Sequence, residues 1–116
     1  MNKFAKDFLE RLKQFAIKVL EIADSLPSKP GAWALGGQVA KSAVSIPQNF
    51  AEAQAASSKR HFTTCIEISE REARETFVSL DLIARRKYLT VSIAEVLKES
   101  DEIIAMLTSI AVKSKQ

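Results

Sequence analysis

Two glutamates, one cysteine and one histidine near the middle of this chain are of residue types that perform chemistry in enzymes. Glu72 and Glu75 would share one face of a helix, as a general acid and a general base require. The thiol of Cys65 could act as a nucleophile, or bind a metal together with the imidazole of His61. An enzyme that uses Glu72, Glu75 and Cys65 is therefore one hypothesis for the chain.

The surroundings of these residues favour structural roles instead. Arg71 and Arg74 flank the glutamates, and such neighbours usually form ion pairs on a helix surface. Cys65 adjoins Ile66, in a position typical of a small buried side chain. The chain has no second histidine or cysteine, and it contains no glycine-rich phosphate loop, nucleophile elbow or H-E-x-x-H motif. We predict a protein that is not an enzyme and binds no metal or other cofactor.

A row of polar residues, called here the polar row, is the more informative feature. Its members are Ser42, Ser45, Asn49 and Glu52, whose spacings of 3, 4 and 3 residues place them on one face of a helix. A row of this kind in a small helical protein indicates a specific partner, either another helix or another subunit.

Small or polar residues also recur along the next helical segment, at Cys65, Ser69, Glu72 and Thr76. If the two rows face each other, or face a neighbouring copy, Asn49 and Glu52 could bond Arg71 or Arg74. Alternatively, the polar row satisfies backbone groups around Pro47. The two interpretations are compatible, because a satisfied network also fixes register. We predict an assembly role for the polar row and Glu72.

Four helices are expected to position these side chains. Apolar residues recur every three or four positions in segments 3–26, 32–56, 58–87 and 91–113, which is the period of amphipathic helices. Pro27 and Pro30 should end the first helix, and Ser58 and Thr90 are the expected N-caps of the third and fourth. Short turns then favour an all-α fold, an antiparallel up-down-up-down bundle with left-handed packing, in one domain spanning residues 1–116.

Pro47 lies inside the second of these helices. It removes one backbone N–H and crowds the carbonyl of Ala43, a defect of about 3 kcal/mol if nothing compensates it. The helix either breaks there or bends and continues. The apolar period stays in phase from Leu35 through Phe50, which favours a continuous, kinked helix.

Composition limits the classes of protein further. Apolar residues make up 47% and charged residues 27% of the chain, a balance typical of soluble globular domains. The sequence has no signal peptide and no apolar run long enough to span a membrane, so we expect a cytoplasmic protein. Four helices of this size leave a thin core, which oligomerisation would complete.

The formal charge of +3 permits contact with nucleic acid without requiring it. Cations cluster at Lys59 and Arg60 and again at Arg85, Arg86 and Lys87, and these five are the candidate nucleic-acid contacts. We find no aromatic residue interleaved with them to stack on bases, and no known nucleic-acid module. In a ring of identical subunits, however, each cluster would be repeated and the local field would be strong.

Three stretches carry a family resemblance: S-I-P-x-N-F-A-E-A from Ser45, A-S-S-K-R-H-F from Ala56, and E-A-R-E-T from Glu72. They resemble the four-helix-bundle proteins encoded by intervening sequences in bacterial 23S ribosomal RNA genes. The chain departs from that pattern at two places. Phe50 stands where isoleucine is usual, and Val78-Ser79 stands where relatives often carry a bulkier run of aromatic and aliphatic residues after the E-T pair. The departures leave the fold untouched but put in doubt any contact made by that bulkier run.

The resemblance implies a homopentameric ring without established enzymatic activity. It also implies a similarity to the accessory variability determinant of diversity-generating retroelements, which has a basic surface and binds a reverse transcriptase and nucleic acid. Our leading hypothesis is a homo-oligomeric accessory protein that binds RNA or a ribonucleoprotein. The alternative is a protein–protein scaffold that docks a partner enzyme such as a retroelement reverse transcriptase.

Overall fold

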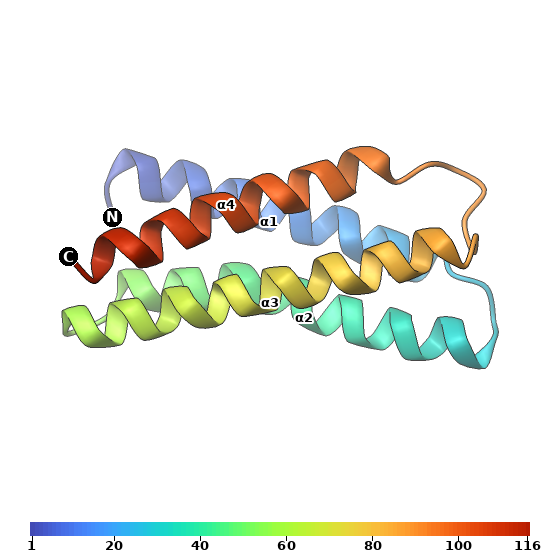
Figure 1. Cartoon of the computed structure of the whole chain (residues 1–116), viewed down its shortest axis with the longest axis horizontal. Helices are drawn as coiled ribbons and strands as arrows, with labels where there is room; N and C mark the ends of the chain where they lie inside the picture. Colours follow the sequence, from blue (N-terminus) through green and yellow to red (C-terminus); the bar gives the residue numbers. More distant parts are fainter.

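The computed structural model describes residues 1–116, which form four helices and no strand (Figure 1). The helices are α1 (Lys3–Asp24), α2 (Pro30–Gln54), α3 (Lys59–Arg85) and α4 (Ala94–Ser114). Both chain ends and the α2–α3 turn lie at one end of the molecule, and the other two connections lie at the opposite end, so successive helices run in opposite directions. The predicted all-α four-helix bundle is confirmed. Its left-handed packing stays a prediction.

Local chemistry explains most of the helix boundaries. The Ser58 hydroxyl accepts from the backbone N–H of His61 at 3.1 Å, which confirms the predicted N-cap of α3. Pro30 begins α2 rather than ending the preceding segment, because a proline at the first helical position gives up an N–H that would have no partner there. The predicted cap at Thr90 is wrong. α4 begins later, where Ser92 Oγ accepts from the N–H of Ala94 at 3.2 Å.

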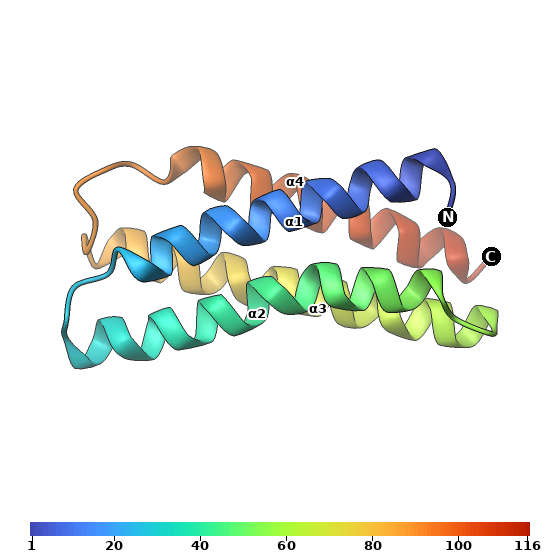
Figure 2. The ribbon, with the colours of Figure 1, turned by 180° about the vertical axis from the view of Figure 1, so that it is seen from behind.

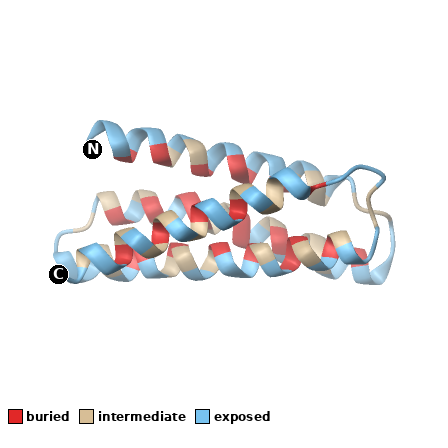
Figure 3. Ribbon diagram, turned by 45° about the horizontal axis from the view of Figure 1, so that its top comes forward, coloured by how far each residue is buried: buried red, intermediate tan, exposed pale blue.

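The four helices bury one continuous core along the length of the bundle (Figure 3). Its largest fully buried side chains include Leu12, Phe15, Ile46, Phe50, Ile66, Leu80, Ile83, Ile103 and Leu107. The rings of Phe8 on α1 and Phe50 on α2 meet edge to face, with centroids 5.1 Å apart. These contacts follow from the apolar spacing of each helix, which places one stripe of every helix toward the others.

α2 continues through Pro47, so the predicted continuous helix is confirmed (Figure 2). Pro47 is itself buried, and its neighbours Ile46 and Phe50 belong to the core. The burial of this stretch outweighs the missing backbone hydrogen bond. None of the four helices is long and apolar enough to cross a lipid bilayer.

One bidentate ion pair joins α1 to α4. Arg11 Nε and Nη2 donate to the two carboxylate oxygens of Glu99 at 2.7 and 2.6 Å, and Nη1 lies 3.2 Å from Met106 Sδ. These hydrogen bonds lower the pKa of the Glu99 carboxyl below its ordinary value. The two helices are therefore held together at this point of their length.

Candidate assembly and nucleic-acid surfaces

The polar rows of α2 and α3 face each other inside the bundle. The hydroxyls of Ser42 and Thr76 are hydrogen-bonded at 2.7 Å, and both side chains are buried. The backbone carbonyl of Val39 lies 3.3 Å from Ser42 Oγ, and that of Glu72 lies 2.8 Å from Thr76 Oγ1. Because each hydroxyl has one hydrogen, one of the two donates to the other hydroxyl, and that second hydroxyl donates to its own backbone carbonyl. Each hydroxyl thus has partners within the chain, so this pair fixes the register of α2 against α3.

Further donors surround Pro47. Ser69 Oγ of α3 donates to the backbone carbonyl of Ile46 at 2.9 Å. The Asn49 amide donates to the carbonyl of Ser45 at 2.9 Å, and the Ser45 hydroxyl donates to that of Lys41 at 3.0 Å. These bonds reach backbone carbonyls that precede Pro47, but none reaches the carbonyl of Ala43, which is the one left without a partner by the missing N–H.

Glu52 differs from the other members of the polar row. It is exposed at the end of α2, and its side chain forms no hydrogen bond or ion pair within the chain. Its carboxylate is therefore free to meet a group from outside the chain, as an assembly residue would.

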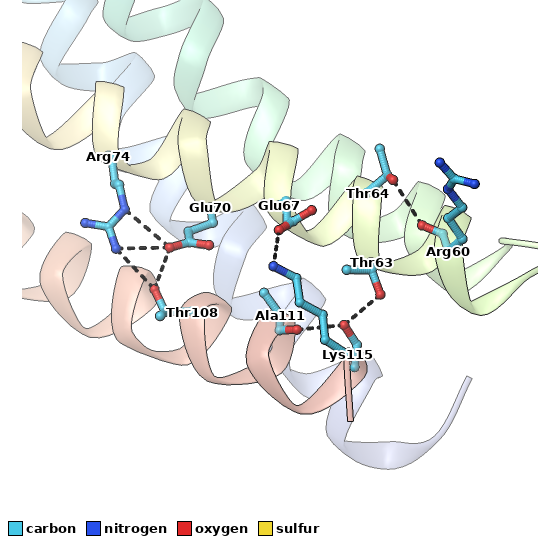
Figure 4. A network of polar contacts seen from close by, with 10 residues as sticks. Arg60, Thr63, Thr64, Glu67, Glu70, Arg74, Thr108, Ala111 and Lys115 are labelled. Carbon is cyan, nitrogen blue, oxygen red and sulfur yellow. Dashed lines mark hydrogen bonds and ion pairs between the residues drawn. The ribbon is translucent and has the colours of Figure 1, made fainter.

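The expected bonds from Arg71 or Arg74 to Asn49 or Glu52 do not form within one chain. Arg74 instead pairs with Glu70 at 3.0 Å and donates to Thr108 of α4 at 3.3 Å (Figure 4). Arg74 also lines the groove between α2 and α3, but Glu70 and Thr108 already engage its guanidinium.

A polar seam between α3 and α4 is the feature that the sequence reasoning missed. Thr108 donates to Glu70 at 2.8 Å, Lys115 pairs with Glu67 at 2.6 Å, and the hydroxyls of Thr63 and Ser114 meet at 2.8 Å (Figure 4). The signal was present in the spacing of Thr63, Glu67, Glu70 and Arg74 along one side of α3. These bonds align α3 with α4.

A groove of about 570 Å³ lies between α2 and α3 and contains the paired carboxylates. Its lining consists of Gln38, Lys41, Ser42, Glu72, Arg74, Glu75, Val78 and Ser79. Burial raises the pKa of the Glu72 carboxyl, as does its contact with Glu75, while Arg71 and Lys41 act in the opposite direction. The groove offers charge, and the Ser42 hydroxyl in its lining is hydrogen-bonded to Thr76. No three side chains of His, Cys, Asp or Glu lie close enough together to hold a metal ion.

Glu72→Gln is expected to raise the melting temperature at pH 7, by less than about 4 °C. Because the pKa of Glu72 is raised, the folded chain holds more protons than the unfolded chain between the ordinary and the raised pKa. The free energy of unfolding contributed by this group therefore falls as the pH rises through that window. Thermal melts by circular dichroism should show the gain at pH 7 and its disappearance below about pH 4.

Glu21→Gln is the matched control for that experiment, because Glu21 is exposed and forms no ion pair. It should leave the melting temperature nearly unchanged at both pH values. A Glu72→Gln variant that melts below the parent at pH 7 would show that the charged carboxylate is favourable, against the direction of its pKa.

Cys65 and His61 lie one helical turn apart on α3 but differ in exposure. Cys65 is buried, and burial raises the pKa of its thiol, with a smaller contribution from the charge of Glu52. A raised pKa disfavours the reactive thiolate. His61 is exposed in the first turn of α3.

The two cation clusters lie at opposite ends of α3. Lys59 and Arg60 begin the helix, whereas Arg85 ends it and Lys87 follows, so about 40 Å separates them in a bundle 44 Å long. One chain therefore cannot present them as a single surface. Lys59 Nζ donates to the backbone oxygen of Gln116, while Arg60 has no carboxylate partner.

The second cluster, called here the basic corner, consists of Arg85, Arg86 and Lys87. Arg85 pairs with Asp81 at 3.0 Å, but the other two cations have no carboxylate partner. The guanidinium of Arg86 lies 4.9 Å from the ring centroid of Tyr88 and donates to its hydroxyl at 3.2 Å. An aromatic ring therefore does accompany the cations, contrary to the expectation from the sequence.

Lys87 adopts a positive φ of 55°, which is uncommon for a residue other than glycine, asparagine or aspartate. The chain turns sharply here and leaves the helix. Tyr88 then lies against the first turn of α2, where a Cβ added to Gly31 would come within 2.6 Å of the tyrosine hydroxyl. Gly31 therefore leaves the space that Tyr88 needs, and this contact anchors the basic corner beside the start of α2.

Comparison with known proteins places this geometry in a family. The family model described as 23S rRNA-intervening sequence protein matches residues 6–109. The chain is also similar to a crystal structure from Bacteroides thetaiotaomicron, described as a protein of unknown function from the S23 ribosomal protein family. The TM-score is 0.83 at 27% identity, covering 92% of this chain and 96% of the other. No curated protein matches the sequence at a significant level.

Proposed function

The chain belongs to the 23S rRNA-intervening sequence protein family, and from this premise we propose that it is a cytoplasmic, non-enzymatic accessory protein that binds RNA or a ribonucleoprotein as a homo-oligomer. The observation that carries the proposal is the basic corner. Arg86 and Lys87 have no carboxylate partner, and the first of them stacks on Tyr88. Unneutralised cations beside an aromatic ring suit the phosphates and bases of RNA.

The basic corner is favoured over the Lys59–Arg60 cluster for a physical reason. A binding surface needs charges that are free to meet phosphate, and Lys59 already donates to Gln116 within the chain. Lys115 near the same end is neutralised by Glu67. At the basic corner only Arg85 is paired with a carboxylate of the chain. The electrostatic attraction to RNA is therefore concentrated there.

Self-association would multiply this charge. α2 carries only two charged residues, Lys41 and Glu52, along its 25 residues. Trp33 at its start is 63% exposed, and Val78 on α3 is 57% exposed. Exposed apolar side chains on α2, which has few charges, and on α3, which has many, support an interface between copies, and five copies is the number that the family resemblance implies. Each added copy brings another basic corner to the assembly.

Native mass spectrometry is expected to show a particle of five times the 12.8 kDa chain mass. Val78→Glu should dissociate it into smaller species, because burying a carboxylate in an apolar interface is strongly unfavourable. Val112→Glu, at an equally exposed valine on α4, is the matched control and should leave the mass unchanged. A single-copy particle for the parent chain would contradict the assembly.

Filter binding with fragments of 23S ribosomal RNA tests the proposed function. The chain should retain RNA at about 50 mM salt and lose it progressively as the salt concentration rises, because phosphate contacts release counterions. Failure to retain any RNA at about 50 mM salt, where such contacts are strongest, counts decisively against the proposal.

A second candidate function is a scaffold that docks a partner enzyme such as a reverse transcriptase. The exposed Phe4 favours it, because this ring lies at the opposite end of the bundle from the basic corner. Co-purification of a partner protein that survives nuclease treatment would support this function, and loss of the partner on nuclease treatment would refute it.

A further inference from the structure

An apolar groove opens between α1 and α4 near the end of the bundle that carries both chain ends. Its volume is about 640 Å³, and Phe4, Phe62, Met106 and Ile110 form its apolar walls. Ser109, Lys113 and Ser114 complete the lining. Figure 3 shows α1 and α4 lying well apart at this end.

The Arg11–Glu99 pair explains where the groove begins. The bidentate pair ties α1 to α4, and the same guanidinium touches Met106, which lines the groove. No hydrogen bond or ion pair joins the two helices between Arg11 and the chain ends, where they meet only through core residues such as Ala5, Phe8 and Ala111. Phe4 remains 53% exposed, although it stacks on Phe8 with ring centroids 5.8 Å apart.

The lining of the groove carries a single charge, and that charge is positive. Lys113 is the one charged residue in its lining and has no carboxylate partner. Asp7, one turn after Phe4 on α1, is already paired with Lys3 at 2.8 Å. A ligand would therefore meet apolar walls and one unneutralised cation.

We propose that this groove binds an amphipathic helix of a partner protein whose apolar face is flanked by acidic residues. Met106 and Ile110 lie one helical turn apart on α4 and face Phe4 across the groove. Such walls suit side chains that project from a docking helix at positions i, i+3, i+4 and i+7. An acidic flank would pair with Lys113, which gives the site its preference among amphipathic helices.

This inference rests on the scaffold function and gives it a surface and a partner chemistry. It is separate from RNA binding, because the groove and the basic corner lie at opposite ends of the bundle. Filter binding of RNA and docking of a helix can therefore fail independently.

The chain's two methionines provide the test. Protein labelled with ¹³C at the methionine methyl groups gives one reporter in the groove, Met106, and one outside its lining, Met1. The probe is a synthetic helix with leucine on one face and glutamate on its flanks, and the control probe carries lysine in place of glutamate. The acidic helix should shift the Met106 signal saturably and bind at least about tenfold more tightly than the lysine helix.

Variants show whether the groove itself is responsible. Phe4→Glu and Lys113→Glu both change exposed side chains, so the fold should survive, and each should weaken acidic-helix binding at least about tenfold. Val78→Glu, outside the groove, should leave the intrinsic affinity per chain unchanged. RNA retention by Phe4→Glu should equal that of the parent.

Three results would each overturn the proposal. The first is an unmoved Met106 signal at millimolar acidic helix, and the second is equal binding of the acidic and basic helices. The third is a Met106 signal that changes with protein concentration alone, because a second copy of the chain would then fill the groove.

Discussion

Phe50→Ala is expected to lower the free energy of unfolding by about 3–5 kcal/mol. Phe50 is only 1% exposed, and its ring meets that of Phe8 edge to face. Alanine would remove this contact between α1 and α2 and leave a cavity that the closely packed helices cannot fill. Equilibrium unfolding in denaturant, followed by circular dichroism at one fixed protein concentration, measures the change.

Phe4→Ala is the matched control, because Phe4 stacks on the same Phe8 ring but is 53% exposed. It should cost far less, below about 1.5 kcal/mol. Equal losses for the two variants would mean that Phe50 does not occupy the centre of the core.

Replacing all three residues of the basic corner with glutamine is expected to weaken RNA binding at least about a hundredfold at low salt. Arg85, Arg86 and Lys87 are exposed, and glutamine keeps much of their length while removing the charge. The loss should be similar for different RNA sequences, because phosphate contacts carry no sequence information. Filter binding measures the affinity, and circular dichroism checks that the fold is intact.

The matched control neutralises Lys59 and Arg60 at the opposite end of α3. These two residues were equally good candidates in the sequence, but Lys59 is engaged within the chain. The control should weaken RNA binding less than about fivefold. A larger loss from this pair than from the basic corner would place the binding surface at the wrong end of the bundle.

Features set by local chemistry could be predicted from the sequence. The apolar period of each helix predicted the four-helix bundle, because a helix must bury its apolar stripe. The cap at Ser58 was predicted because a serine hydroxyl bonds an N–H only three residues away. The continuity of α2 through Pro47 followed from the unbroken apolar phase.

Features set by the packing of whole helices could not be predicted in the same way. The partner of Arg74 depends on how far α3 is rotated toward α4, and a small rotation changes which neighbour it meets. Tyr88 reaches Gly31 and Arg86 only because the chain turns at Lys87 with a positive φ, which no residue type there signals. Thr90 resembled a cap, but the loop runs on to Ser92 before α4 starts.

The family resemblance was drawn from three stretches between Ser45 and Thr76, and the family model matches residues 6–109. The stretch from Ser45 to Ala53 combines three members of the polar row with Pro47, and its Ser45 and Asn49 side chains bond backbone carbonyls one turn earlier in α2. The groove between α1 and α4 leaves no comparable mark in the sequence.

The salt dependence of RNA binding tests the central claim most directly. Each phosphate contact contributes about 0.7–0.9 to the slope of log affinity against log salt concentration. The parent chain should show a steep negative slope, and the variant with glutamine at Arg85, Arg86 and Lys87 should show a slope shallower by about 2 or more. Identical slopes for the two proteins would contradict the account, because the basic corner would then contact no phosphate.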